Sequence, residues 1–397
     1  MSGLPSVSIV IANWNGRQLL EPCLTSIGTL DYPSAALEVI VVDNGSADDS
    51  VAWLASAYPA VRVVTNADNL GFAAASNQGA EAAGGELVAF VNNDVRLDPA
   101  WLRPLVEVLQ DGDVAAAGSR ILDWEGRRYD FDGGAMSFHG HGISRRHGHP
   151  YLPGPVAAPT PTLFACGAAM AVTRASFLEA GGFDTDYFAY FEDVDLGWRL
   201  WVQGERVVHV PGSMAYHRHH GSGMAADRHI RLLERNALAS LVKNYDDSNL
   251  AIVQPAAVAL LNARAVAAAT TNGAARAVYE DTLVEFEAER ATLVGKRAQV
   301  QARRRRPDDA ILPLFGEPFR PCMFGREYFH AQQEIVRSHG VGRLFGGETV
   351  GMEAFVDELQ WRIGQLEGEL TAARAGSAVS PEPSSRSLWR RLWERGT

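Results

Sequence analysis

Cysteine is scarce in this sequence. The chain of 397 residues has three, Cys23, Cys166 and Cys322, which lie far apart and are odd in number. Neither a disulfide framework nor a cysteine-based zinc motif follows from that pattern, and a reducing compartment fits it. The sequence also shows no basic-then-apolar leader at its start and no apolar run of membrane-spanning length. We therefore expect a cytoplasmic protein without a secretion signal or a membrane-spanning helix.

Positive charge is in short supply as well. Lysine and arginine number 36 against 47 aspartates and glutamates, so the net charge is −11. Nucleic-acid-binding domains are usually basic over the binding surface, so we expect no nucleic-acid partner. The content of apolar residues, 47%, is that of a globular protein, and the length exceeds one ordinary domain.

Short apolar runs alternate with helical segments over the first hundred residues. The expected strands are Val7–Ala12, Val39–Val42, Val61–Thr65 and Leu87–Val91, and the expected helices are Gln18–Ile27, Ser50–Ala57 and Ala73–Ala83. This alternation predicts an α/β fold with a parallel sheet.

Polar, turn-forming residues follow each expected strand, in the segments 13–16, 43–46, 66–71 and 92–94. In open α/β sheets, ligands bind beyond the carboxyl ends of the strands. Turns alone also favour asparagine, aspartate and glycine, which is the structural alternative for any one segment. The first segment reads Asn-Trp-Asn-Gly and not Gly-x-Gly-x-x-Gly, so a dinucleotide-binding dehydrogenase lacks support.

Two of these strand ends carry acids suited to a nucleotide. Asp43 can accept a hydrogen bond from a base N–H, although a plain turn is the alternative. Asn92, Asn93 and Asp94 can hold Mg²⁺ or Mn²⁺ through oxygen atoms, together with substrate phosphates. A departing diphosphate needs its charge neutralised as its bond breaks, which such a cation would provide.

Three further acids, Glu192, Asp193 and Asp195, fall within four residues. Clustering raises the proton affinity of at least one carboxylate, and a carboxylate beside a hydroxyl is what a general base requires. The alternative is that acids favour the first turn of a helix. Upstream, Gly167 lies among small residues where a substrate could approach the backbone closely.

Two groups of histidines stand out. A neutral imidazole is a common metal ligand. One group, His217, His219 and His220, follows an expected strand at Arg206–Val210, and Arg218 between them can pair with phosphate. A second group could hold zinc, although its glycine-rich surroundings favour a mobile loop over the acceptor site. Its members are His139, His141, His147 and His149.

The composition shifts near residue 226. We expect a catalytic domain at 1–225, a helical extension at 226–306, an irregular connection at 307–347, a heptad-like helix at 348–374, and a linker with a short basic amphipathic tail at 375–397. The heptad spacing over 352–370 predicts a homodimer, with docking on its own domain as the alternative. The tail predicts peripheral contact with the inner face of the cell membrane, with a packed helix end as the alternative.

The order of the motifs resembles a known family. The segments are VSIVIANWNG, VIVVDNGSADDS, NADNLGFAAASNQG, FVNND, CGAAMAVTRASFLEAGGFDTDYFAYFEDVDLGWRL and YHRHHGS. They resemble the inverting GT-A glycosyltransferases of the large bacterial family that includes rhamnosyl- and galactofuranosyltransferases of cell-surface polysaccharides. The resemblance implies a GT-A fold, with a Rossmann-like nucleotide-binding mixed sheet flanked by helices. It also implies a nucleoside-diphosphate sugar donor, Mn²⁺ or Mg²⁺, and inversion at the anomeric carbon.

For the donor and the metal, the resemblance implies roles residue by residue. Asp43 looks like the acid that recognises the nucleotide base, and Asp94 and His217 look like the metal ligands. Asn92 stands where the family has the first acid of its Asp-x-Asp motif. The donor-binding positions beside Asp43 are Asn13, Asn44, Asn69, Gly71, Asn92 and Asn93.

For the acceptor, the resemblance implies that Asp193 is the catalytic base. Glu192, Asp195 and Gly167 are the expected acceptor-binding residues. The acceptor itself is expected to be a glycan or a lipid-linked glycan, with rhamnosyl- or galactosyl-type transfer favoured. The alternative is a catalytically silent sugar-nucleotide-binding or scaffold subunit, which Asn92 motivates.

Overall fold

The computed structural model describes residues 4–219, 224–271, 273–315 and 325–345. The expected heptad seam at 352–370 and the tail at 375–397 lie outside these residues, so the homodimer and the membrane contact stay predictions. The described chain divides into two units. The sheet unit holds residues 4–135, 142–219 and 300–307, and the helical unit holds the others.

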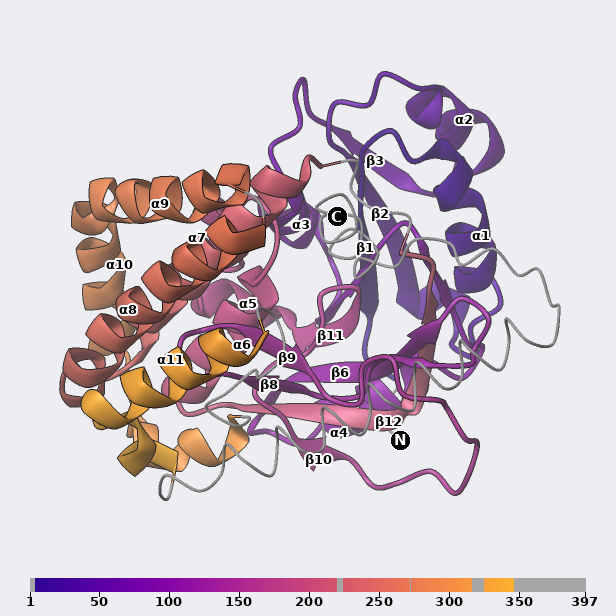
Figure 1. Ribbon diagram of the computed structural model, residues 1–397. Coiled ribbons are helices and arrows are strands. Elements are labelled where there is room, and N and C mark those ends of the chain that lie inside the picture. Colours follow the sequence, from indigo (N-terminus) through magenta and orange to yellow (C-terminus); the bar gives the residue numbers. More distant parts are fainter. Residues whose placement is uncertain (1–3, 220–223, 272, 316–324, 346–397) are drawn as a thin grey trace, which may run out of the picture. The chain divides into compact units, whose positions relative to one another are not determined.

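The sheet unit is built on one mixed sheet of ten strands (Figure 1). Eight run in the order β10-β12-β6-β11-β4-β1-β2-β3, β5 and β7 pair with β12 and β6, and β8 and β9 form a separate two-stranded sheet. The strands are β1 (Val7–Asn13), β2 (Leu37–Asp43), β3 (Arg62–Thr65), β4 (Leu87–Val91), β5 (Val95–Leu97), β6 (Val114–Asp123), β7 (Tyr129–Phe131), β8 (Gly134–Met136), β9 (Gly142–Ser144), β10 (Thr160–Pro161), β11 (Ala169–Thr173) and β12 (Arg206–His217).

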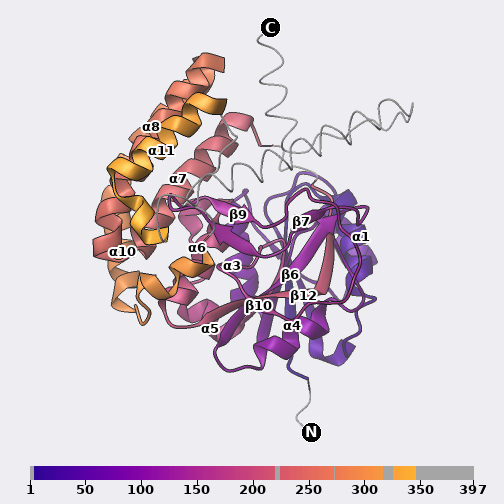
Figure 2. The same ribbon diagram turned by 60° about the horizontal axis from the view of Figure 1, so that its bottom comes forward.

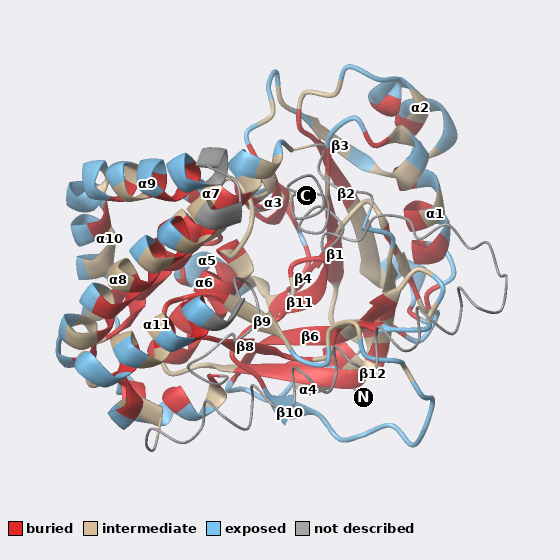
Figure 3. Cartoon of the chain, in the orientation of Figure 1, coloured by how far each residue is buried: buried red, intermediate tan, exposed pale blue. Residues whose placement is uncertain are grey.

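Burial explains which strands are central. Every residue of β4 is buried, and so is nearly all of β1, which suits apolar strands with neighbours on both sides. The edge strand β3 is half exposed. Figure 3 shows the buried strands of the sheet in red. Strands β1 to β4 are parallel, whereas β11 runs antiparallel to both β4 and β6. The polar carboxyl ends of β1, β2 and β4 therefore meet at one edge of the sheet.

Six helices belong to the sheet unit and the others form most of the helical unit. They are α1 (Arg17–Ile27), α2 (Ser50–Ala57), α3 (Phe72–Ala82), α4 (Leu102–Leu109), α5 (Arg174–Glu179), α6 (Glu192–Val202), α7 (Ala226–Asn244), α8 (Asp247–Thr271), α9 (Gly273–Ala288), α10 (Arg290–Ala302) and α11 (Gly325–Ser338). Each strand and helix expected within the first hundred residues is present, with bounds that move by at most two residues.

The boundary of the two units differs in two places from the expected domain limits. Residues 136–141 belong to the helical unit, where the Tyr245 hydroxyl donates a hydrogen bond to the carbonyl oxygen of Phe138 at 3.1 Å. Residues 300–307 belong to the sheet unit, because the backbone N–H groups of Arg305 and Arg306 donate to the carbonyl oxygen of Val202. Both exchanges rest on contacts between residues far apart in sequence, which composition does not reveal.

Helix α8 corrects one expectation. Its segment Asp247–Ala269 is long and apolar enough to cross a membrane by length and composition, although no apolar run of that length was expected. In the helical unit α8 packs against α7, α9 and α11, and Figures 1 and 2 both show α11 beside it. It also carries a buried ion pair, with Arg264 Nη2 at 2.8 Å from Glu234 Oε2 of α7. His141 Nε2 lies 2.9 Å from the same carboxylate oxygen.

Candidate functional site

A row of polar side chains joins the carboxyl ends of β1, β2 and β4. Asn13 and Asp43 are register partners, and Asn13 Nδ2 donates to Asp43 Oδ2 at 3.0 Å. Asn93 Nδ2 donates in turn to Asn13 Oδ1 at 2.9 Å. The other oxygen of Asp43 accepts the backbone N–H of Ser46 at 3.0 Å. Three of the expected donor-binding residues therefore form one hydrogen-bonded chain, in which the Asp43 carboxylate is buried and held in a fixed orientation.

Asn44 organises the loop that precedes α3. Its Nδ2 group donates to Asn69 Oδ1 at 2.9 Å and to the carbonyl oxygen of Gly71 at 3.1 Å, and its Oδ1 accepts the N–H of Leu70. Gly71 has a φ of +88°, and a Cβ there would collide with the carbonyl oxygen of Phe188. Asn44, Asn69 and Gly71 therefore lie together, and the buried Asn44 shapes the loop.

The expected metal ligands meet beside this row. Asp94 follows β4, His217 ends β12, and pairing of His217 with Val95 of β5 brings the two side chains together. Asp94 Oδ1 lies 3.2 Å from His217 Nε2, and each side chain is 12% exposed. Ligand atoms about 2.0–2.2 Å from a shared cation, at roughly a right angle, lie about 3 Å apart. The pair therefore fits Mn²⁺ or Mg²⁺. Asn92 contributes backbone here, since its N–H donates to the carbonyl oxygen of Ala168.

Asp130 of β7 is a member of this cluster that sequence reasoning missed. Its Oδ2 lies 2.9 Å from His217 Nδ1, and its Oδ1 lies 2.7 Å from His219 Nε2 and 3.4 Å from His147 Nδ1. Ligand atoms of Asp130, His217 and His219 all lie within 4.8 Å of one another. The one signal in the sequence was the pair Asp130 and Asp132, whose spacing of two puts both on the same side of an extended strand.

The charges in this cluster shift one another. Burial opposes ionisation of Asp130, but hydrogen bonds from His147, His217 and His219 outweigh it and hold its pKa well below the usual range. Burial likewise opposes protonation of His217, yet Asp94 and Asp130 raise its pKa to about 10. Two carboxylates around one imidazole are an environment that favours bound positive charge.

The four histidines weighed as a zinc site do not form one group. His139 and His141 belong to the helical unit, where His141 contacts Glu234. His147 and His149 belong to the sheet unit, where His147 contacts Asp130. Within the described part of the chain, the converging group of possible metal ligands is Asp130, His217 and His219.

The expected base lies in the first turn of α6. Asp193 Oδ2 accepts the backbone N–H of Gly167 at 2.9 Å, and Oδ1 accepts that of Val194 at 2.8 Å. Burial raises the pKa of Asp193, and these hydrogen bonds oppose the rise. The neighbouring Glu192 has its pKa raised well above the usual range, by burial and then by the charge of Asp193. Its Oε2 is buried without a hydrogen-bond partner among the described residues.

Asp195 lies elsewhere than expected. Its side chain is 0% exposed, and its Oδ2 accepts from Arg199 Nε at 2.8 Å. Arg199 also donates to the carbonyl oxygens of Ala180 and Gly182. The Asp195 carboxylate thus holds an arginine that ties α6 to the preceding turn. This buried pairing speaks against direct contact with an acceptor.

The turn around Cys166 connects the base with the metal cluster. Burial raises the pKa of the Cys166 thiol well above its usual range, and the charges of Asp193, Asp130 and Glu192 add to the rise. Carboxylates from both groups are therefore near one sulfur atom. A Cβ added at Gly167, in the same turn, would lie in van der Waals contact with Phe72 and Asp193. Asp193 and the backbone of Asn92 thus both contact residues 166–168.

The backbone leading into α6 is strained. Phe188, Tyr190 and Phe191 have φ values of 60°, 72° and 64°, in a region that bulky side chains rarely adopt. Such residues cost on the order of 1–3 kcal/mol each and cluster at functional sites. The carbonyl oxygen of Phe188 also accepts the N–H of Ala73 at 3.2 Å. The strained turn therefore contacts the start of α3 and places Asp193.

Comparisons with known proteins show which family the sequence is similar to. Residues 8–180 match the model of Glycosyl transferase family 2. The chain is 32% identical over 241 residues to the O-antigen biosynthesis protein RfbC of Myxococcus xanthus, which covers 57% of this chain and 18% of that protein. It is 30% identical over 217 residues to the N-acetylglucosaminyl-diphospho-decaprenol L-rhamnosyltransferase of Mycobacterium tuberculosis strain H37Rv, which covers 49% of this chain and 71% of the relative.

A solved structure shares the fold. The crystal structure of GalNAc-T7 with UDP, GalNAc and Mn²⁺ matches with a TM-score of 0.52 at 18% identity, over 65% of this chain and 52% of that one. Identity this low supports a likeness of fold alone.

Proposed function

Since this chain belongs to glycosyl transferase family 2 and has a GT-A fold, we propose that it is an inverting glycosyltransferase. It moves a sugar from a nucleoside diphosphate to a hydroxyl of a glycan or a lipid-linked glycan during cell-surface polysaccharide synthesis. The names of two relatives, an O-antigen biosynthesis protein and an N-acetylglucosaminyl-diphospho-decaprenol L-rhamnosyltransferase, support rhamnosyl-type transfer to a cell-surface glycan, and the resemblance of the motifs adds galactosyl-type transfer.

One observation carries the proposal: a buried carboxylate with a raised pKa and a carboxylate–histidine pair lie around one turn. The Asp193 carboxylate accepts the Gly167 N–H, and the backbone N–H of Asn92, two residues before Asp94, donates to the Ala168 carbonyl oxygen. A raised pKa makes a carboxylate a better proton acceptor, which suits Asp193 to the role of general base. A direct displacement with inversion requires a general base on one side of the anomeric carbon and the leaving diphosphate on the opposite side.

The residues at the strand ends bind the donor and the metal. The row of Asn13, Asp43 and Asn93 binds the nucleoside, and the loop around Asn69 and Gly71 lies along the donor. Asp94 and His217 would hold Mn²⁺ or Mg²⁺, which when bound neutralises the charge that builds on the leaving diphosphate.

On the acceptor side, Asp193 accepts the proton of the attacking hydroxyl. The acceptor oxygen forms a bond to the anomeric carbon while the bond from that carbon to the diphosphate oxygen breaks. Glu192, whose buried Oε2 has no partner among the described residues, hydrogen-bonds an acceptor hydroxyl, and Gly167 leaves room beside Asp193. We place the protein in the cytoplasm, peripheral to the inner face of the cell membrane, where a lipid-linked acceptor is within reach.

The experiment is donor turnover by the purified protein. A panel of nucleotide sugars is incubated with Mn²⁺, with Mg²⁺ or with EDTA, and released nucleoside diphosphate is measured with and without acceptor glycans. We expect metal-dependent release from one donor. The second candidate, a silent sugar-nucleotide-binding subunit, is motivated by Asn92 and predicts donor binding without release under every condition.

A further inference from the structure

Asp130 is connected to the proposed metal pair through a single imidazole. His217 presents Nε2 to Asp94 at 3.2 Å and Nδ1 to Asp130 at 2.9 Å. The ring therefore bridges two carboxylates with its two nitrogens. When one nitrogen of a histidine binds a metal, the other usually donates its proton to a carboxylate or carbonyl, which fixes the tautomer and the ring orientation.

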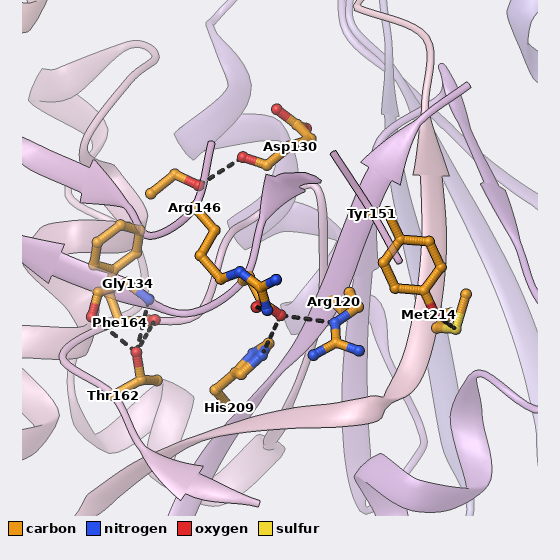
Figure 4. A network of polar contacts seen from close by, with 11 residues as sticks. Arg120, Asp130, Gly134, Arg146, Tyr151, Thr162, Phe164, His209 and Met214 are labelled. Carbon is orange, nitrogen blue, oxygen red and sulfur yellow. Dashed lines mark hydrogen bonds and ion pairs between the residues drawn. The ribbon is translucent and has the colours of Figure 1, made fainter. Parts of the chain in front are cut away.

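The sheet register holds Asp130 in place. Strand β6 pairs with both β7 and β12, so that Leu122 has Tyr129 on one side and Tyr216 on the other. Asp130 and His217 follow those two partners directly. The backbone of Asp130 is held as well, since the Ser144 hydroxyl donates to its carbonyl oxygen at 2.6 Å, a contact drawn in Figure 4. A partner fixed by strands orients a ligand better than one on a loop.

The contacts of Asp130 suit an orienting group better than a direct ligand. Its side chain is 10% exposed, and both oxygens already face imidazole nitrogens, Oδ2 that of His217 and Oδ1 that of His219. A cation bound by these oxygens would have to replace those contacts. Asp94 Oδ1 and His217 Nε2 lie 3.2 Å apart, the separation that two ligand atoms of a shared cation have, and a cation bound there would replace their direct contact.

We propose that Asp130 is a positioning residue of the metal site: it accepts the Nδ1 proton of His217 and so directs the Nε2 lone pair toward Asp94. The inference rests on the proposed function, because it assumes a divalent cation at Asp94 and His217. It adds a residue that touches neither the cation nor the substrate. Loss of an outer partner of this kind typically weakens metal binding about 10–100-fold.

The residue that follows β7 provides a matched control. This residue, Asp132, is 7% exposed and contacts Arg120 at 2.7 Å, Arg146 at 3.1 Å and His209 at 3.1 Å. Figure 4 shows the side chains of Arg120, Arg146 and His209 pointing toward one another. Loss of Asp132 therefore removes a similarly buried carboxylate and its ion pairs from the turn next to β7, without removing the partner of His217.

The test is Mn²⁺ binding, measured by electron paramagnetic resonance with Mn²⁺ alone, together with the number of coupled nitrogen atoms from electron spin echo modulation. We expect one coupled nitrogen in the wild type and weaker binding in Asp94→Asn. Asp130→Ala should bind about 10–100-fold more weakly, and Asp130→Asn, which keeps the shape and one acceptor oxygen, should fall in between. Asp132→Ala should lower the melting temperature and leave the affinity for Mn²⁺ unchanged.

The outcomes separate this inference from the function on which it rests. If Asp94→Asn binds Mn²⁺ as tightly as the wild type does, Asp94 is not a metal ligand. The proposed metal site is then wrong, and the inference fails with it. Binding that Asp94→Asn weakens but both Asp130 variants leave intact would overturn the role of Asp130 alone. Two coupled nitrogens would make His219 a ligand and also overturn it. If Asp130→Ala fails to fold, Asp130→Asn decides.

Discussion

Asp193 is the residue whose removal tests the chemistry most directly. We expect Asp193→Asn to lower the rate of transfer about 10²–10⁴-fold, the usual contribution of a general base, while donor affinity stays the same. The hydrogen bond from Gly167 can persist to the amide oxygen, so the fold should be retained. Initial rates and donor titration measure the two effects. Asp186→Asn, an exposed acid in the preceding turn, is the matched control, and a similar loss there would contradict the assignment.

Glu192 should make stability depend on pH. Its folded-state pKa is raised well above the ordinary value of 4.5 by burial and by Asp193, so the folded chain holds its proton more tightly than the unfolded chain. Stability from this group is full below the ordinary pKa and falls as the pH rises from there toward the raised pKa. Glu192→Gln removes this titration. The variant should therefore gain stability over the wild type as the pH rises, in urea unfolding at pH 5 and pH 8.

Parallel pH curves for the two proteins would show that Glu192 titrates normally. The histidine–carboxylate cluster around His217 is present in both proteins, so its contribution to the pH dependence of stability cancels in the comparison. Transfer assays on the same variant report whether the acceptor contact proposed for Glu192 also matters, through the KM for the acceptor.

Among the elements, the loop before α3 depends on one glycine. Gly71→Ala places a Cβ against the carbonyl oxygen of Phe188 and forces an alanine into a positive-φ region that is essentially limited to glycine, which alone costs about 1–3 kcal/mol. We expect weaker donor binding and a lower free energy of unfolding, measured by donor titration and urea unfolding. Gly154→Ala, where a Cβ would meet open space, should change neither. Equal donor affinity and equal free energy of unfolding of the two variants would mean that the loop accommodates a Cβ at Gly71.

The helical unit depends on the buried pair between α7 and α8. Arg264→Met leaves the Glu234 carboxylate, 3% exposed, with His141 as its remaining charged partner among those described here. Breaking a buried pair by removing one partner typically costs about 3–5 kcal/mol. Chemical unfolding should show such a loss, and Arg264→Met with Glu234→Leu should recover much of it. A double variant no more stable than the single one would locate the loss in packing.

The elements also show where sequence reasoning succeeded and where it could not. Local patterns were sufficient for the strands. Asp43, Asp94, Asp193 and His217 stand at or beside element ends, as expected, and their roles stay predictions. Asp130 was out of reach, since its partner His217 is 87 positions away and the sheet register alone joins them. Asp195 was assigned with its acidic neighbours, although Arg199 one turn later could have signalled an ion pair.

For the whole molecule, membrane contact remains a prediction from the sequence. The tryptophans and arginines of residues 388–395 suit an anionic surface, whereas the chain as a whole carries a charge of −11. We expect the full chain to sediment with anionic vesicles at low salt, less so at high salt, and a variant ending at Ala373 to stay in solution. Sedimentation of the truncated variant would place the contact elsewhere in the chain.

The contact between the loop before α3 and the turn before α6 has a consequence for protein engineering. The Phe188 carbonyl binds Ala73 N–H, and Asn77 exchanges two hydrogen bonds with the backbone of Phe183. Two segments more than a hundred residues apart in the sequence are therefore joined by specific hydrogen bonds. Exchanging residues 66–77 alone, in order to change the sugar specificity, would leave these residues without matching contacts in residues 181–193. A functional chimera therefore has to exchange both segments together.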